Sequence, residues 1–275
     1  MNEKINLSDA EIENLLDHII QVYGYDFTGY ARASLYRRIN RLFSLDKFTS
    51  FSDFAGRVIA DRWYMLRFIE EITVNMTEMF RDPGFFSSLR KKIIPELAGR
   101  SLIRIWLAGC SSGEEVFSLA ILLQELHLLD RSIIYATDLN PAVLKLAKRG
   151  VFPMQHMKQY SQNYINSGGN MEFSSYYSAR HDYATFNPGL ISRVVFSTHN
   201  LATDHSFNLF QLIICRNVLI YFNRNLQNRV FSLFHESLDN QGFLGLGPKE
   251  TLRFSQISAK FRQVNEENKI WKKIA

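Results

Sequence analysis

The sequence of 275 residues contains only two cysteines, Cys110 and Cys215, and no histidine lies near either of them at the spacing of a zinc site. A disulfide framework and a structural zinc site are therefore not expected. The seven histidines show neither a catalytic-triad nor a metal-ligand pattern, so we expect no metal in the functional site. Few, reduced thiols are typical of cytoplasmic proteins.

A long apolar run is also missing from the sequence. A membrane-spanning helix needs about 20 mostly apolar residues, and polar residues interrupt every apolar stretch here well before that length. The polar, acidic N-terminus is unlike a secretory signal. With 46% hydrophobic and 21% charged residues, the composition is that of a folded protein with its own core. We expect a cytoplasmic protein that does not insert into membranes.

Strong net charge is absent as well, because the excess of basic residues is only +5. This is too little to indicate nucleic-acid binding by itself. The basic residues are nevertheless concentrated in 27–45, which contains four arginines and no acidic residue. At helical spacing this segment has an apolar face (Leu35, Ile39, Leu42) opposite a basic face (Arg37, Arg38, Arg41). Such a face is either merely solvated or a docking surface for an acidic partner. Nucleic acid is the less favoured partner, because interleaved exposed aromatic residues and a strong overall charge are both lacking.

The periodicity of apolar residues changes along the chain. Residues 1–85 are predicted to form an all-helical N-terminal domain, in which 52–71 is one helical stretch, and 86–100 is predicted to be a linker. Between 101 and 275, buried strands alternate with helices, which predicts an α/β domain with a parallel sheet. The segment of about 155–195 is rich in Ser, Tyr, Asn and Gly and is predicted to be an insertion with a few short strands.

The α/β part contains a regular series of apolar segments. Strands are expected over 102–107, 133–137 and 209–215, with a closing pair over 243–246 and 269–271, and helices over 114–126, 141–148 and 226–238.

Functional residues are expected directly after the strands, because ligands bind at the carboxyl ends of parallel strands. Gly109 and Gly113 follow the first strand, and their spacing does not fit the dinucleotide fingerprint. Glu114 would repel a pyrophosphate at the start of the next helix but suits a cationic ligand. Asp138 follows the second strand, where a carboxylate can hold two ribose hydroxyls. Together these residues predict S-adenosylmethionine as the ligand; the alternative is that they only form a tight turn and helix caps.

Three segments resemble the methyltransferases of chemotaxis receptors, the CheR family. They are AGCSSGEEVFSLA (108–120), ICRNVLIYF (214–222) and NMTEMFR (75–81), the last with Met79 in place of an aromatic residue. Residues 25–41 are similar to the basic helical segment of that family. The sequence departs from the family pattern at Val116-Phe117 and at Gly247-Pro-Lys-Glu250, outside the positions to which roles are assigned.

The resemblance implies a Rossmann-like class I methyltransferase domain with a small inserted β-subdomain, preceded by a small all-α domain. It implies S-adenosylmethionine as cofactor, with S-adenosylhomocysteine as product, and the helical cytoplasmic bundle of a chemoreceptor as partner. The resemblance also implies catalytic roles for Arg81 and Tyr221. Cofactor contacts fall on Asn75, Thr77, Arg81, Gly109, Glu114, Asp138, Asn200, Leu201, Arg216 and Asn217, and substrate docking on Arg37, Arg38 and Arg41.

The expected reaction is methyl transfer to the side-chain carboxylate of a receptor glutamate, with Arg81 steering that carboxylate and Tyr221 orienting it. Two other functions stay open: a non-catalytic adapter that binds the cofactor or its product, and a methyltransferase for small-molecule carboxylates. Arg81 as a helix-end residue and Tyr221 as a core aromatic are the corresponding structural alternatives. No heptad pattern indicates a coiled coil, so a monomer is expected.

Overall fold

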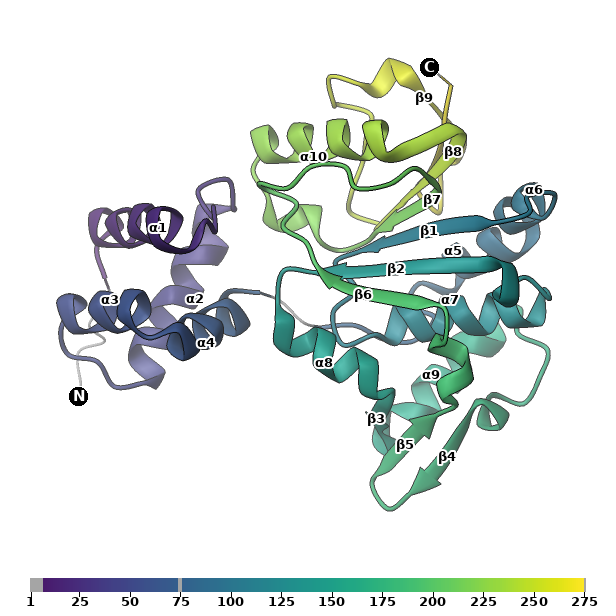
Figure 1. Cartoon of the computed structure of the whole chain (residues 1–275), viewed down its shortest axis with the longest axis horizontal. Helices are drawn as coiled ribbons and strands as arrows, with labels where there is room; N and C mark the ends of the chain where they lie inside the picture. The colour runs from purple at the N-terminus through teal and green to yellow at the C-terminus, as the bar shows by residue number, and fades with distance from the viewer. Residues whose placement is uncertain (1–6, 74–75, 275) are drawn as a thin grey trace.

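The computed structural model describes residues 7–73 and 76–274, which form a helical part and a larger α/β part (Figure 1). The helical part consists of α1 (Asp9–Tyr23), α2 (Arg32–Leu45), α3 (Phe51–Ala60) and α4 (Arg62–Ile72). Apolar residues at helical spacing bury one face of each helix in a common core. Among the described residues, no helix has both the length and the apolar composition that crossing a bilayer requires.

Local capping explains where these helices begin and end. The side chains of Ser8 and Glu11 form a capping box at the start of α1, and Gly24 ends that helix in the left-handed region at φ 73°. The predicted single helix over 52–71 is instead two helices. Asp61 separates them because its backbone is extended and its carboxylate accepts hydrogen bonds from the N–H groups of Trp63 and Tyr64 at the start of α4.

The α/β part is built on a seven-stranded sheet with the strand order β6-β2-β1-β7-β8-β10-β9. The strands are β1 (Ile103–Ala108), β2 (Ser132–Asp138), β6 (Val194–Thr198), β7 (Phe210–Cys215), β8 (Leu238–Leu246), β9 (Phe261–Asn265) and β10 (Ile270–Lys273). Neighbouring strands from β6 to β8 are parallel, and β10 is antiparallel to both β8 and β9. The predicted strands are therefore present, and β6 and β9 are additions.

Side chains of β1 alternate between two hydrophobic clusters, one on each face of the sheet. Ile105 and Leu107 pack in a cluster with residues of α7 (Glu114–Glu125), whereas Trp106 packs with residues of α10 (Arg224–Ser237) on the other face. A further helix, α8 (Pro141–Arg149), follows β2. Helices on both faces and a mostly parallel sheet make this a doubly wound α/β domain, as the sequence predicted.

The segment 86–100, predicted to be a linker, is mostly helical. It lies within α5 (Pro83–Ser88), a π-helical turn (Leu89–Ile93) and α6 (Ile94–Leu97). Phe86, Leu89 and Ile94 are fully buried in the cluster that also contains residues of β1 and α7. The linker prediction was wrong because these side chains cover the sheet, and the segment belongs to the α/β part.

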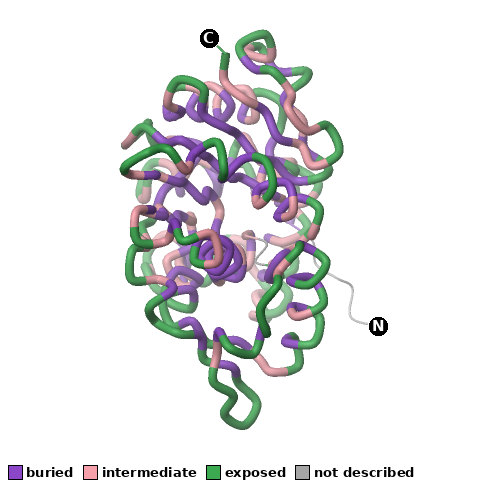
Figure 2. The backbone as a smooth tube through the Cα atoms, turned by 90° about the vertical axis from the view of Figure 1, so that its right-hand side faces the viewer, coloured by how far each residue is buried: buried purple, intermediate pink, exposed green. Residues whose placement is uncertain are grey.

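A second, three-stranded antiparallel sheet follows α8. Its strands are β3 (Val151–Pro153), β4 (Tyr177–Arg180) and β5 (Tyr183–Phe186), in the order β3-β5-β4. Between β3 and β4 lies α9 (Met157–Asn166), which packs against α5. Figure 2 shows the β4–β5 hairpin as an exposed projection from the body of the molecule. The inserted β-subdomain thus begins at β3, earlier than residue 155, and β6 at its end already belongs to the large sheet.

Candidate active site

One cavity lies at the carboxyl ends of β1, β2, β6 and β7 and extends to the helical part of the chain. Nine of the predicted site residues line it: Thr77, Arg81, Gly109, Asp138, Asn200, Leu201, Arg216, Asn217 and Tyr221. The other lining residues are Tyr30, Ile72, Thr73, Met76, Glu78, Cys110, Ser111, Glu115, Leu139, His199, Val218 and Phe222. Predicted residues far apart in sequence are thus brought to one place, where the topology of a parallel sheet puts a ligand.

Of the predicted cofactor residues that the structure describes, only Glu114 does not line this cavity. Asn75 lies outside the described residues. Glu114 is buried beside the cavity, where the Ser112 hydroxyl donates to its carboxylate at 2.7 Å and the Tyr160 hydroxyl at 3.5 Å. Burial raises the pKa of Glu114. The cavity wall contains the next residue, Glu115, in its place.

Asp138 is held at the end of β2 by the backbone. Its Oδ2 accepts a hydrogen bond from the N–H of Ser111 at 2.9 Å, and its Oδ1 accepts one from the N–H of Asn140 at 3.0 Å. Gly109 turns the chain at φ 79°, and a Cβ there would lie 2.4 Å from Cγ2 of Val218. A side chain at position 109 would therefore push Val218 out of the cavity wall.

Arg81 is carried by a backbone in an unusual conformation. The residues on either side of it, Phe80 and Asp82, have φ values of 51° and 55° and so lie in the left-handed region. The N–H of Phe80 donates to the Ser118 hydroxyl at 2.8 Å, and the Asn163 amide donates to the carbonyl of Met79 at 3.0 Å. These contacts fix the turn whose apex is Arg81.

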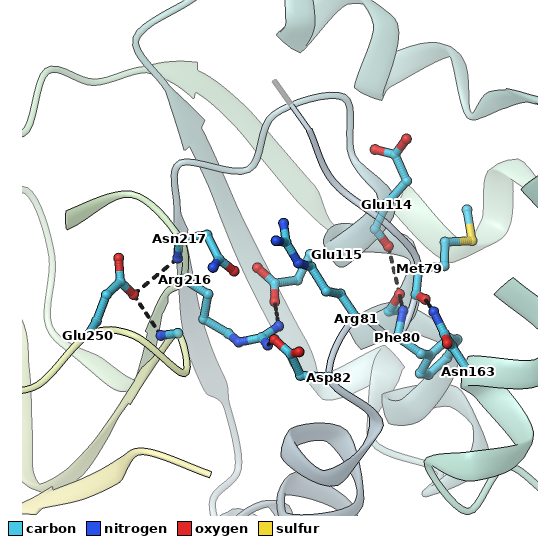
Figure 3. A network of polar contacts seen from close by, with 12 residues as sticks. Met79, Phe80, Arg81, Asp82, Glu114, Glu115, Asn163, Arg216, Asn217 and Glu250 are labelled. Atoms are coloured by element: carbon cyan, nitrogen blue, oxygen red, sulfur yellow. Dashed lines mark hydrogen bonds and ion pairs between the residues drawn. The ribbon is translucent and has the colours of Figure 1, made fainter. Parts of the chain in front are cut away.

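Arg216 connects this turn to the rest of the site (Figure 3). Its guanidinium lies 2.5 Å from Oδ2 of Asp82 and 2.6 Å from Oε1 of Glu115, and 4.3 Å above the ring of Phe85. The Arg216 side chain is only 2% exposed. Arg216 lines the cavity, but its guanidinium is already paired with two carboxylates. The geometry therefore favours a structural role, in which Arg216 holds Asp82 and Glu115 in place.

Glu250 likewise holds a segment of the site in place, the loop after β7. Its buried carboxylate accepts hydrogen bonds of 2.7–3.0 Å from the N–H groups of Gly247, Asn217, Val218 and Leu219. Burial raises the pKa of Glu250, although these four donors oppose that shift. The carboxylate stabilises a loop in which Asn217 has a φ of 60° and which leads directly to Tyr221.

Within the described residues, no three His, Cys, Asp or Glu side chains are arranged to hold a metal ion. Cys110 and Cys215 are free and buried, and burial raises the pKa of both thiols well above the usual range. The polar side chains that line the cavity are therefore carboxylates, amides, hydroxyls, two arginines and the imidazole of His199.

The three arginines predicted for docking lie on α2, away from the cavity lining. Arg37 is exposed. Arg41 pairs with the carboxylate of Glu71 at 2.5 Å, and Arg38 donates to the carbonyl of the same residue at 3.0 Å. Glu71 therefore neutralises part of the basic face, and Arg37 is the most available of the three.

Comparison with known proteins agrees with this geometry. Residues 75–270 match the family model described as CheR methyltransferase, SAM binding domain, and residues 10–73 match the CheR methyltransferase all-alpha domain. The chain belongs to the CheR methyltransferase family. The predicted family, fold class and S-adenosylmethionine cofactor are thereby confirmed.

Individual members of the CheR family resemble the chain over most of its length. A protein of Pseudomonas putida named as the methyltransferase Cher3 is 44% identical over 268 residues, which are 97% of either chain. A chemotaxis protein methyltransferase of Listeria innocua is 33% identical and covers 83% of this chain, with 85% of its own length matched. One of Borreliella burgdorferi is 28% identical over 92% of each chain. The predicted enzyme class, a chemotaxis protein methyltransferase, is confirmed.

Several residues that line the cavity or hold its loops were not foreseen. Glu115 directly follows the predicted Glu114, and Phe222 follows Tyr221, so both could have been found as neighbours of the motifs. Glu250 was noted in the sequence only as part of a departure from the family pattern. Tyr30 lies in the helical part, where no strand end or motif marks it as a ligand contact.

Proposed function

We propose that this CheR methyltransferase transfers a methyl group from S-adenosylmethionine to the side-chain carboxylate of glutamates on the cytoplasmic helical bundle of a chemoreceptor. The observation that carries the proposal is the single cavity in which Arg81, Asp138 and Tyr221 meet, in a chain that matches the family over almost its whole length.

The charges around the cavity suit a cationic cofactor. Three lining residues are acidic, Glu78, Glu115 and Asp138, and two are basic. One of the two, Arg216, is already paired with Glu115 and with Asp82. When bound, S-adenosylmethionine supplies an electrophilic methyl group on a positively charged sulfonium. Asp138 is well placed for the ribose, because its position after β2 is held by two backbone N–H groups. Asn200 and Leu201 follow β6 and would frame the adenine.

The role first predicted for Glu114, binding the amino group of the cofactor, stays a prediction. Its carboxylate is engaged by Ser112 and Tyr160. Thr77, Gly109 and Asn217 line the cavity and are assigned to the cofactor without individual roles.

The substrate needs no general base. A glutamate side chain has a pKa of about 4.3 and is ionised at neutral pH, so its oxygen is ready to attack. The task of the protein is therefore to orient that oxygen, which is catalysis by positioning. Arg81 donates from Nη1 to the carbonyl of Met76 at 3.0 Å, and this is its only hydrogen bond recorded within the described residues. Its remaining guanidinium N–H groups are available to steer the incoming carboxylate.

Tyr221 would orient the same carboxylate through its hydroxyl. The loop carrying Tyr221 is fixed from two sides: Glu250 holds residues 217–219, and the backbone carbonyl of Tyr221 accepts a hydrogen bond from the N–H of Ala31 at 2.7 Å. A rigid loop is what an orienting residue requires, because a displacement of about 1 Å can reduce the rate of a positioned reaction about 100-fold.

The basic face of α2 is the proposed contact with the receptor. A bundle that carries glutamates is complementary to a cationic surface, which accelerates association and sets the orientation of the partners. Arg37 is the central residue of this contact because Arg38 and Arg41 are both engaged by Glu71. We further propose that the protein acts in the cytoplasm and as a monomer.

The test is incubation of the purified chain with methyl-labelled S-adenosylmethionine and membranes that contain chemoreceptors of the same organism. Label on the receptor that mild base releases as methanol supports the proposal, because only a carboxyl methyl ester behaves in this way. The Arg81→Ala variant should abolish the label, and Arg149→Ala, an exposed arginine at the end of α8, should not.

Two results would favour the other functions. Binding of S-adenosylhomocysteine without transfer of label to any acceptor would indicate a non-catalytic adapter. Base-labile label on a small molecule, with an unlabelled receptor, would indicate a methyltransferase for small carboxylates.

A further inference from the structure

The helical part and the α/β part are joined by a short backbone ladder at the cavity. Tyr30 forms an antiparallel bridge with Phe222. The N–H of Ala31 donates to the carbonyl of Tyr221 at 2.7 Å, and the N–H of Asn223 donates to the carbonyl of Gly29 at 2.8 Å. Residues 29–31 and 221–223 therefore lie side by side, and the loop before α2 reaches the residue proposed to orient the substrate.

This ladder places the ring of Tyr30 in the cavity wall, together with Asp138 and Leu139. The ring packs edge-on against Phe222 and Phe27, with centroid separations of 5.0 and 5.3 Å. The ring is thus fixed on both sides by aromatic neighbours.

The hydroxyl of Tyr30 differs from those of other tyrosines in the chain. The hydroxyls of Tyr23, Tyr64 and Tyr176 each donate to a protein oxygen at 2.7–3.0 Å. Within the described residues, no hydrogen bond is recorded for the hydroxyl of Tyr30. Tyr30 is half-buried and lines the cavity, so a ligand there can take the place of solvent as the partner of this hydroxyl.

The hydroxyl would act as a hydrogen-bond donor. Burial raises the pKa of Tyr30, and the negative charges on Asp138 and Asp26 raise it further. The phenol therefore remains protonated. Tyr30 and Asp138, the residue assigned to the ribose, line the same cavity.

We propose that Tyr30 is a cofactor-binding residue contributed by the helical part of the chain, and that its hydroxyl donates to a ribose oxygen of S-adenosylmethionine beside Asp138. The proposal rests on the proposed function for the identity of the ligand and for the role of Asp138. It makes the helical part a component of the cofactor site as well as a surface for the receptor.

The experiment compares Tyr30→Phe with the unaltered chain in calorimetric titrations with S-adenosylhomocysteine and with methylthioadenosine, which keeps the nucleoside and lacks the amino-acid tail. Tyr30→Phe removes only the oxygen atom, so its melting temperature should match that of the unaltered chain. We expect both ligands to bind about 2- to 10-fold more weakly, as the loss of one hydrogen bond implies. Tyr36→Phe is the matched control, because that hydroxyl contacts Glu13 and is not part of the cavity.

Equal affinity of Tyr30→Phe and the unaltered chain for S-adenosylhomocysteine would overturn the proposal. Weaker binding of S-adenosylhomocysteine with unchanged binding of methylthioadenosine would overturn it too, because the contact would then lie outside the nucleoside. Failure of the proposed function gives a different result: the unaltered chain itself would bind neither ligand, or would bind them and methylate no receptor.

Discussion

Arg216 and Asp82 are 134 residues apart in the sequence, yet their side chains form an ion pair at 2.5 Å. Since Asp82 directly follows Arg81, this pair ties the turn that carries Arg81 to the end of β7. The same guanidinium also holds Glu115 at the start of α7. One buried arginine thereby fixes the relative positions of three segments that border the cavity.

Replacing Arg216 by methionine should lower the free energy of unfolding by about 3 kcal/mol, because it leaves the nearly buried carboxylate of Glu115 without its partner, whereas the Asp82 side chain is 42% exposed and is solvated. Urea denaturation measures this change. Arg253→Met is the matched control: Arg253 also pairs with a carboxylate, that of Glu266, but their side chains are 52% and 70% exposed, so the loss should be at most about 1 kcal/mol. A stable Arg216→Met chain with a large loss of S-adenosylhomocysteine affinity would instead indicate that Arg216 holds the cofactor directly.

Replacing Arg81 by lysine should reduce kcat for receptor methylation at least about 100-fold, because lysine keeps the charge but loses the planar pair of donors that orients a carboxylate. The unfolding free energy should change little, since Arg81 is partly exposed and donates only to Met76 among the described residues. Initial rates at saturating cofactor measure the effect. A variant with full kcat and an increased KM would show that Arg81 binds the receptor without orienting the reacting carboxylate.

Cofactor affinity should fall on acidification through the protonation of Asp138. Burial raises the pKa of its carboxyl above the ordinary value, although the N–H groups of Asn140 and Ser111 oppose the shift. Asp138 therefore gains a proton, and stops accepting from ribose hydroxyls, at a pH above the usual aspartate range of about 3.9. Titrations with S-adenosylhomocysteine across mildly acidic pH test this, and Asp138→Asn should show weaker binding with a smaller pH dependence.

The raised pKa of Asp138 also makes the free energy of unfolding depend on pH. A salt-bridged aspartate, whose pKa is lowered in the folded chain, stabilises the fold more as pH rises, and Asp138 does the reverse. Between the unfolded and folded pKa values the folded chain binds more protons, so the contribution of Asp138 to the free energy of unfolding decreases as pH rises through this window. Urea denaturation of Asp138→Asn should lack this contribution. A contribution that increases with pH would contradict the assigned direction of the pKa shift.

Reversing the charge at Arg37 should increase KM for the receptor about 3- to 10-fold, with little change in kcat or in S-adenosylhomocysteine affinity, because Arg37 is exposed on α2 and outside the cavity. The difference between Arg37→Glu and the unaltered chain should shrink at high salt. Arg149→Glu makes the same charge change at the exposed end of α8 and serves as the control. Equal KM values for the two variants would exclude a specific role of the basic face.

Much of the fold was predictable because each element has its own local pattern. The strand at Ile103–Ala108 is an apolar run interrupted only by Arg104, and α1 begins at a capping box. The segment 86–100 was misjudged because its helical pieces are short, and burial against the sheet decides the outcome. The helix α9, with two Gln and two Asn among its ten residues, was missed for a similar reason: Tyr160 and Tyr164 stabilise it by packing, which composition does not reveal.

The site was predictable as far as it follows strand ends and family motifs. Gly109, Asp138 and Tyr221 line the cavity as those patterns suggested. The contacts of Arg216 with Asp82, and of Glu250 with the loop at 217–219, join segments that are distant in sequence. Such pairings depend on how the chain folds back on itself, and a single sequence carries no local signal for them.

The close approach of Gly29 to α10 limits how the two parts of the chain can be exchanged between relatives. A Cβ at position 29 would lie 2.9 Å from Cβ of Leu226, so the loop before α2 fits against α10 only without a side chain at this point. A hybrid that combines the helical part of one family member with the catalytic part of another must therefore inherit both sides of this contact together. Grafting only the helices would change receptor preference and cofactor affinity at once, so the two effects have to be separated by point variants such as Arg37→Glu and Tyr30→Phe.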